Sequence, residues 1–162
     1  MYDTSRSHAE ILAILADGPS QIAGFTDGLS AEQLITPPDT GAWSLRDILA
    51  HLRACSDMWG QAIQVILDQD RPSFKAVNPG TWIKQTDYLS QEFQPSLAAF
   101  TSQRAGLLTV LEPLAPDAWS RSATVTGFGK ARERTVYSYA EWLATHERSH
   151  VKHIKRLADT LR

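Results

Sequence analysis

The chain has 162 residues, of which 43% are hydrophobic and 21% charged, as expected of one soluble globular domain spanning residues 1–162. Its formal net charge of −2 gives no electrostatic reason to expect nucleic acid or an anionic membrane as a partner, and no run approaches the roughly 18 apolar residues of a membrane span. Cys55 is the only cysteine, which excludes an internal disulfide. Together with the lack of a recognisable signal peptide, this favours a cytoplasmic protein.

Four segments have the apolar spacing of amphipathic helices. They are predicted at residues 5–29, 45–70, 90–111 and 136–161. The second follows the loop TPPDTGAWS, with Ser44 as its N-cap and Asp47 in the capping-box position. The connections at 71–82 and 121–134 break the helical pattern. Within the later one, SATVTG is a candidate short strand, but one strand gives no sheet. The sequence therefore predicts an all-α fold, a four-helix bundle.

Three histidines share the apolar face of the last predicted helix, because residues three, four or seven positions apart lie on one side of a helix. The stripe contains Tyr139, Trp142, Leu143, His146, His150, His153, Leu157 and Leu161. Arg148, Lys152 and Arg156 fall on the opposite side, where we expect solvent. A buried imidazole needs a polar partner. Three of them on one stripe therefore indicate a functional cluster rather than separate core histidines.

His51 is the candidate third ligand beside the pair His146 and His150. It flanks the apolar stripe of the second predicted helix, with Asp47 and Cys55 one turn to either side. Added to an i, i+4 pair on a facing helix, it would complete a three-histidine metal site with an open position. Asp47 would either orient His51 or cap the helix. Cys55 is interpreted as a buried structural thiol, and Trp59 and Trp142 as core residues.

Residues 146–150 read HERSH, which matches the H-E-x-x-H motif of zinc peptidases. The extended form of that motif needs glycine at 153 and histidine at 156, where this chain has His153 and Arg156. Other such peptidases take a ligand from well downstream, but only twelve residues follow His150 and none is glutamate. The third ligand must then come from upstream, which disfavours a peptidase. Glu147 remains a candidate general base, or else a residue behind the ligands or at the surface.

These motifs together resemble the DinB-like family of bacterial helical proteins. The resemblance rests on WSLRDILAHL, which contains the histidine of the second helix, on VTGFGKARERTV, and on HERSHVKHI near the C-terminus. It implies a four-helix bundle with up-down-down-up connectivity, often a homodimer, holding one divalent metal ion on three histidines. Carried onto this sequence, the implied ligands are His51, His146 and His150. Many relatives have glutamine where this chain has His153, so the role of His153 is left open.

The same resemblance implies a reaction class, because some relatives are metal-dependent transferases that activate thiols such as bacillithiol or mycothiol. A divalent ion on three neutral imidazoles lowers the pKa of bound water toward about 7 and also favours a bound thiolate. We therefore expect a metal-dependent enzyme acting on small molecules, either a thiol transferase or a hydrolase. Nickel or zinc is the expected metal, with iron or manganese as alternatives. A non-catalytic bundle stabilised by its metal is the second interpretation.

Overall fold

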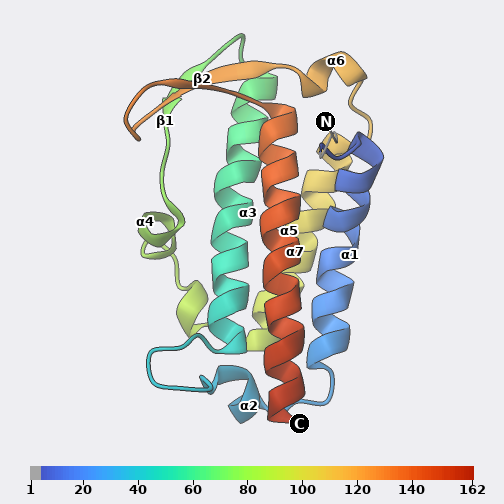
Figure 1. The fold of residues 1–162 in the computed structure, drawn as a ribbon, viewed down its shortest axis with the longest axis vertical. Coiled ribbons are helices and arrows are strands. Elements are labelled where there is room, and N and C mark those ends of the chain that lie inside the picture. The colour runs from blue at the N-terminus through green and yellow to red at the C-terminus, as the bar shows by residue number, and fades with distance from the viewer. Residues whose placement is uncertain (1–4) are drawn as a thin grey trace.

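The computed structural model describes residues 5–162, which form a bundle of four long helices (Figure 1). These are α1 (His8–Thr26), α3 (Leu45–Asp68), α5 (Phe93–Leu111) and α7 (Val136–Leu161). In Figure 1, α1 and α7 run downward while α3 and α5 run upward. The parallel pair α3 and α5 requires a long connection along the length of the bundle. This order is the predicted up-down-down-up connectivity, so the predicted fold class is confirmed.

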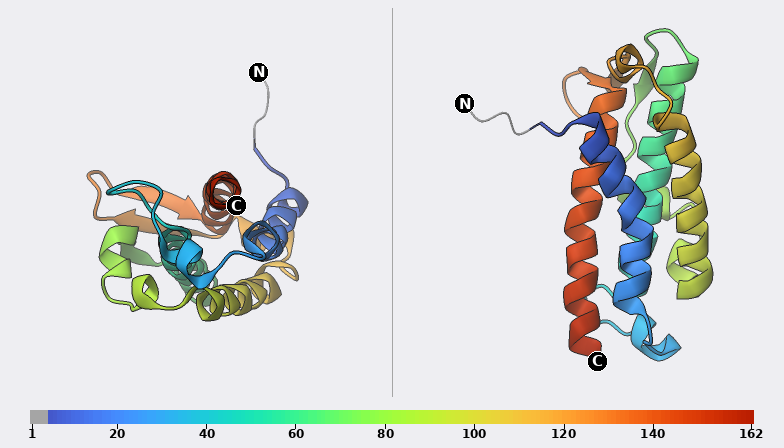
Figure 2. Two further views of the ribbon diagram at one scale, coloured as in Figure 1. Left: turned by 90° about the horizontal axis from the view of Figure 1, so that it is seen from below. Right: turned by 90° about the vertical axis from the view of Figure 1, so that its right-hand side faces the viewer.

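The connections contain short helices and a small sheet. The short helices are α2 (Ala31–Ile35), α4 (Pro79–Ile83), the 3-10 turn η1 (Tyr88–Ser90) and α6 (Pro116–Trp119). The strands are β1 (Ser73–Lys75), β2 (Ser122–Thr126) and β3 (Arg132–Thr135). They form a sheet of order β1-β2-β3, in which β1 is parallel and β3 antiparallel to β2. Figure 2, seen along the bundle, shows α4 and the sheet on the side away from α1.

The expectation of a lone strand without a sheet is wrong. The SATVTG segment does form β2, but it has a partner on each side. One partner, β1, has three residues, too few to show a period-2 pattern. The other, β3, reads RERT, a charged sequence that lacks the usual strand signal. The β1–β2 pairing joins segments that are distant in the sequence, and the β2–β3 pairing includes a segment without a strand signal. Neither pairing could therefore be predicted from the sequence pattern.

The start of α3 agrees with its predicted cap. The Ser44 hydroxyl accepts a hydrogen bond from the Asp47 backbone N–H at 3.1 Å, and the Asp47 carboxylate accepts one from the Ser44 N–H at 2.9 Å. These reciprocal bonds form a capping box that satisfies two otherwise unpaired donors. Of the two roles considered for Asp47, helix capping is therefore the one that the structure supports.

The core has two apolar clusters, one toward each end of the bundle. The upper cluster includes Ile11, Leu15 and Leu143, and the lower one includes Ile22 and Phe100. Between them lies a polar layer that contains the buried side chains Ser56, Arg104 and Glu147. The expected ligands lie on two of the long helices that form this layer: His51 is on α3, and His146 and His150 are on α7. None of the helices within residues 5–162 has both the length and the apolar character needed to span a membrane.

Candidate metal site

The polar layer is organised by one guanidinium group. Arg104 on α5 donates to both carboxylate oxygens of Glu147 on α7, at 2.6 and 2.5 Å. It also donates to the backbone carbonyl of Leu15 on α1 at 2.9 Å and to the hydroxyl of Ser56 on α3 at 3.2 Å. The side chains of Arg104 and Glu147 are each 1% exposed. A single buried side chain therefore contacts all four long helices.

The first helix leaves room for this ion pair by carrying a glycine. A Cβ atom built on Gly18 would lie 2.5 Å from Glu147 Oε2 and 3.1 Å from its Cδ. Both distances are too short for a carbon atom, and Arg104 holds the carboxylate in place on its other side. Helix α1 can therefore approach α7 this closely only because residue 18 has no side chain.

The ion pair also determines how α3 and α7 are rotated. Glu147 directly follows His146, and Ser56 directly follows Cys55. Adjacent residues on a helix point about 100° apart. When α7 directs Glu147 toward Arg104, it therefore turns His146 onto the neighbouring face. Ser56 and Cys55 stand in the same relation on α3, so the buried contact orients both helices for the cluster described next.

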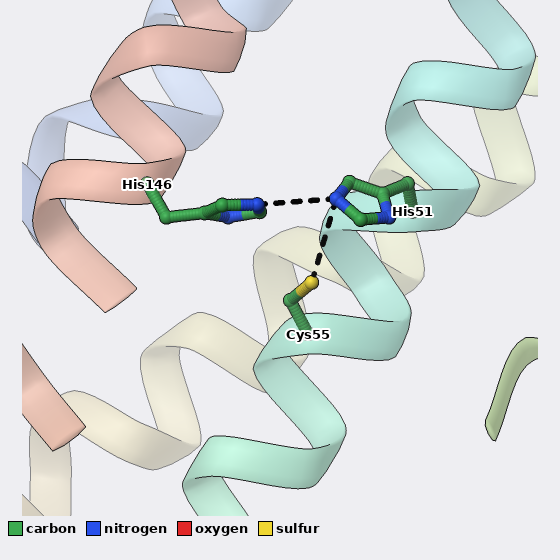
Figure 3. Close-up of side chains that lie close together, drawn as sticks. All are labelled: His51, Cys55 and His146. Carbon is green, nitrogen blue, oxygen red and sulfur yellow. Dashed lines mark hydrogen bonds between the residues drawn. The ribbon is translucent and has the colours of Figure 1, made fainter. Parts of the chain in front are cut away.

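His51, His146 and His150 are brought together across α3 and α7. His51 Nε2 lies 3.1 Å from His146 Nε2, and His150 Nε2 lies 3.2 Å from His146 Nε2. The ring centroids of His51 and His150 are 4.8 Å apart. Cys55 Sγ lies 3.6 Å from His51 Nε2. Figure 3 shows His51 and Cys55 on one helix facing His146 on the other.

The spacing of these atoms fits a divalent ion. Two imidazole nitrogens at about 2.0–2.1 Å from one tetrahedral zinc ion are about 3.3 Å from each other, close to the 3.1 and 3.2 Å observed. The group that meets the distance requirement for a metal site is His51, Cys55 and His146, whose ligand atoms all lie within 4.8 Å of one another. Two of the three expected ligands therefore belong to this group together with Cys55, and His150 adjoins it through His146.

The histidines are neutral at neutral pH, which metal binding requires. Burial, followed by the proximity of His150 and His51, lowers the pKa of His146 from 6.5 to about 4. Burial, followed by the proximity of His51 and His153, lowers the pKa of His150 to about 4. Burial lowers the pKa of His51 as well. Protonating any one of them would place a charge in a partly buried site beside other imidazoles.

Cys55 has the properties of a protonated, buried thiol. The residue is fully buried, and burial, followed by the nearby Glu147 carboxylate, raises the pKa of the thiol to about 12. A thiol with so high a pKa is a poor nucleophile at neutral pH. This agrees with the interpretation of Cys55 as a structural residue, although its position beside His51 is closer to the cluster than the sequence indicated.

Aromatic rings surround the histidine cluster. Trp43 lies against His51 and His150, with ring centroids 5.0 and 6.3 Å away. Trp59 meets His146 edge-on at 5.1 Å and stacks on Trp142 at 4.8 Å. Trp59 is buried as predicted, but the interpretation of Trp142 as a core residue is wrong, because its ring is 46% exposed. It packs on Trp59, and the guanidinium of Arg134 lies over its ring at 5.8 Å.

A cavity of about 750 Å³ reaches the cluster at His146. Its walls come from α3, α4, α7 and the sheet, including Met58, Trp82, Val125 and Trp142. Small-molecule sites commonly have volumes of about 300–1,000 Å³ and mostly apolar walls. The connections at 71–82 and 121–134, which break the helical pattern of the sequence, contribute several of the lining residues.

Of the three roles considered for Glu147, the structure supports that of a buried residue behind the histidine cluster. It is buried, so the surface interpretation is wrong. Both of its oxygens accept hydrogen bonds from Arg104. Burial raises the pKa of this carboxyl group, while the hydrogen bonds and positive charge of Arg104 act in the opposite direction. The structure therefore makes Glu147 the counterion of Arg104 and gives no support to the predicted role as general base.

Arg104 was absent from the sequence-based site, although a signal for it existed. Buried positions on α5 include Leu97, Phe100, Arg104 and Leu111, which follow the helical spacing. An arginine on such a stripe needs a buried acid. Glu147, on the inward side of α7, was the candidate partner. Its position within the H-E-x-x-H motif favoured a catalytic interpretation instead.

Comparison with known proteins agrees with this architecture. A family model of the DinB superfamily matches residues 14–154 of the chain. The chain belongs to the DinB superfamily. A protein of Geobacillus kaustophilus is 27% identical over 154 residues, covering 91% of this chain and 82% of that protein. One of Bacillus licheniformis is 26% identical over 142 residues, covering 87% and 79%. Both are provisionally named metal-dependent hydrolases.

Two solved structures share the fold. YfiT from Bacillus subtilis, described as a probable metal-dependent hydrolase with an unusual four-helix bundle topology, has a TM-score of 0.81 at 18% identity. That match covers 99% of this chain and 92% of YfiT. A protein from Streptococcus pneumoniae has a TM-score of 0.65 at 13% identity and covers 97% and 94%. At these identities the likeness establishes the bundle topology and not the chemistry.

The buried ion pair predicts the effect of Glu147→Gln. Removing one partner leaves the charge of Arg104 buried without a counterion, which costs about 3–5 kcal/mol. We expect urea unfolding to show a loss of this size. Glu141→Gln on the same helix is the control, because Glu141 accepts a hydrogen bond from the hydroxyl of Thr145 one turn away and forms no ion pair within residues 5–162. Equal losses in the two variants would contradict the organising role of the pair.

The lowered histidine pKa values predict an acid-sensitive fold. In metal-free protein the unfolded chain takes up protons on its histidines below about pH 6.5, whereas folded His150 does so only near pH 4. The free energy of unfolding should therefore fall as the pH drops from about 6.5 to 4. The free energy of unfolding of His150→Gln should fall less steeply over this pH range when it is measured with a chelator present. Parallel curves for both proteins would rule out a contribution from His150.

Proposed function

We propose that this protein is a metal-dependent hydrolase of small molecules, with His51, His146 and His150 as the ligands of one divalent ion. The observation that carries this proposal is the approach of His51 Nε2 and of His150 Nε2 to His146 Nε2, next to a cavity that reaches His146. A divalent ion at this point would supply Lewis-acid chemistry that acidifies a water or a thiol beside it. Nickel and zinc are the metals we expect, with iron and manganese as alternatives.

The relatives support the hydrolytic form of this proposal. Several curated relatives are named as metal-dependent hydrolases, at about the same coverage as the family match. The walls of the site are suited to small substrates, because they are mainly aromatic and aliphatic side chains around a bounded space.

The protein side of the reaction follows from the contacts around the cluster. Burial lowers the pKa of all three imidazoles, and His51 and His150 each place Nε2 beside that of His146. Trp43 packs against His51 and His150, and Trp59 packs against His146, so these rings limit the movement of the ligands and restrict water around them. His146 is the ligand that also lines the cavity, which makes its side of the cluster the approach for a substrate.

Thiol transfer is the second candidate, and one observation favours it. Glu147 is fully engaged with Arg104, so the reaction has no help from the carboxylate that serves as base in H-E-x-x-H enzymes. This favours a nucleophile that the metal alone can activate over a water molecule that needs a general base. An ordinary thiol has a pKa of about 8.5, far below that of water, and ionises readily beside a cation.

The ligand set can be tested by metal analysis of tag-free protein. His51→Ala, His146→Ala and His150→Ala should each lose most of the bound metal, and with it the rise in melting temperature that metal provides over chelator-treated protein. Metal binding to the folded state alone contributes about 4 kcal/mol at a thousandfold excess over Kd. His153→Ala is the matched control and should retain the metal. Loss of metal in His153→Ala with retention in His146→Ala would refute the assignment.

The two reactions can be separated with the same metal-loaded protein. Hydrolysis predicts turnover of small esters or amides without added thiol, whereas thiol transfer predicts consumption of an electrophile only when a low-molecular-weight thiol is present. Either activity should fall in His51→Ala as far as in His146→Ala, because both residues hold the same ion. Full metal occupancy with neither activity would favour the non-catalytic, metal-stabilised bundle instead.

A further inference from the structure

The cavity beside His146 has an unbalanced electrostatic lining. Four cationic side chains contribute to its walls: Lys75, Lys130, Arg132 and Arg134, here called the basic rim. No aspartate or glutamate lines it, although acidic residues outnumber basic ones in the chain as a whole, 18 to 16. The remaining walls are largely aromatic and aliphatic. The site therefore combines an apolar interior with a concentration of positive charge.

The sheet register explains how the arginines come to border an apolar space. Arg132 pairs with Val125, and Arg134 pairs with Ala123, across the antiparallel β2–β3 ladder. Residues directly opposite one another on a sheet project from the same face. Val125 and Ala123 are buried, so Arg132 and Arg134 start on the face of the sheet that is turned toward the helices.

The basic rim is not neutralised within the protein. Among residues 5–162, none of its four side chains forms an ion pair within 4 Å, and the two ion pairs found lie elsewhere, at Arg104–Glu147 and Lys155–Asp159. The guanidinium of Arg134 instead lies over the ring of Trp142 at 5.8 Å. Positive groups gathered around an apolar space and lacking acidic partners attract an anion from solution.

A continuous row of rings joins the basic rim to the histidine cluster. Arg134 lies over Trp142, Trp142 stacks on Trp59 at 4.8 Å, and Trp59 contacts His146 at 5.1 Å. All four residues line the cavity. One small molecule in contact with this row would therefore extend from the positive charges at the sheet to the candidate metal position.

We infer that the cavity binds a small organic anion, with its carboxylate at Arg132 and Arg134 and its apolar body along Trp142 and Trp59. This inference rests on the proposed function and names its substrate class. The reacting bond of such a substrate lies several atoms from its negative charge, on the side toward His146. A neutral molecule of the same shape would occupy the apolar part of the cavity but leave the basic rim solvated. The cavity therefore selects substrates by their negative charge and by their length.

Binding of matched probes to metal-free protein tests this inference. 4-Phenylbutyrate, its neutral amide 4-phenylbutyramide and the cation 4-phenylbutylamine share one apolar body and differ in the head group. Their dissociation constants can be measured by calorimetry and by the fluorescence of the lining tryptophans, with chelator present. We expect the carboxylate to bind about five- to tenfold tighter than the amide, the range that one partly exposed ion pair or charged hydrogen bond provides. The amine should bind most weakly.

Charge variants locate the effect. Arg132→Gln combined with Arg134→Gln should remove the preference for the carboxylate while leaving the affinity for the amide unchanged. The matched control, Lys152→Gln with Arg156→Gln, removes two charges from the exposed face of α7 and should retain the preference. Equal binding of carboxylate and amide, persistence of the preference without the two arginines, or no binding of any probe would each overturn the inference. Because no metal is present, these results are independent of whether the proposed hydrolysis occurs.

Discussion

The buried ion pair between Arg104 and Glu147 is the constraint on which the rest of the structure depends. It lies where the two apolar clusters meet, and its guanidinium contacts a residue of every long helix. Desolvation offsets much of the attraction within such a pair, so its net contribution to stability is small compared with an apolar replacement. Its consequence is geometric, since α1, α3 and α7 each supply a hydrogen-bond acceptor to the guanidinium and α1 leaves space for the pair at Gly18.

This arrangement of the helices also assembles the candidate metal site. Because His146 precedes Glu147 and Cys55 precedes Ser56, the helix rotations that complete the ion pair turn the imidazoles toward one another. The H-E-x-x-H match thus arises from two separate requirements on one helix. Two histidines one turn apart face α3, while the glutamate between them faces α5. The sequence that matches a peptidase motif here provides a candidate ligand pair and a structural counterion.

Much of this could be predicted from sequence, because it depends on local periodicity. The four long helices, the Ser44–Asp47 cap and the facing positions of His51, His146 and His150 all follow from spacing along single helices. The remaining features depend on contacts between distant segments. The partner of Arg104, the strands beside SATVTG, and the exposure of Trp142 are set by tertiary packing. No single stretch of sequence contains that information.

The most direct test of this account is anomalous diffraction from crystals of the protein loaded with zinc or nickel. The account predicts one strong peak at about 2.0–2.2 Å from the Nε2 atoms of His51, His146 and His150, with Arg104 still bound to both oxygens of Glu147. A peak held by the Cys55 sulfur and two histidines, with His150 turned away, would contradict the ligand set. A metal bound by the Glu147 carboxylate would contradict the central role given to the ion pair.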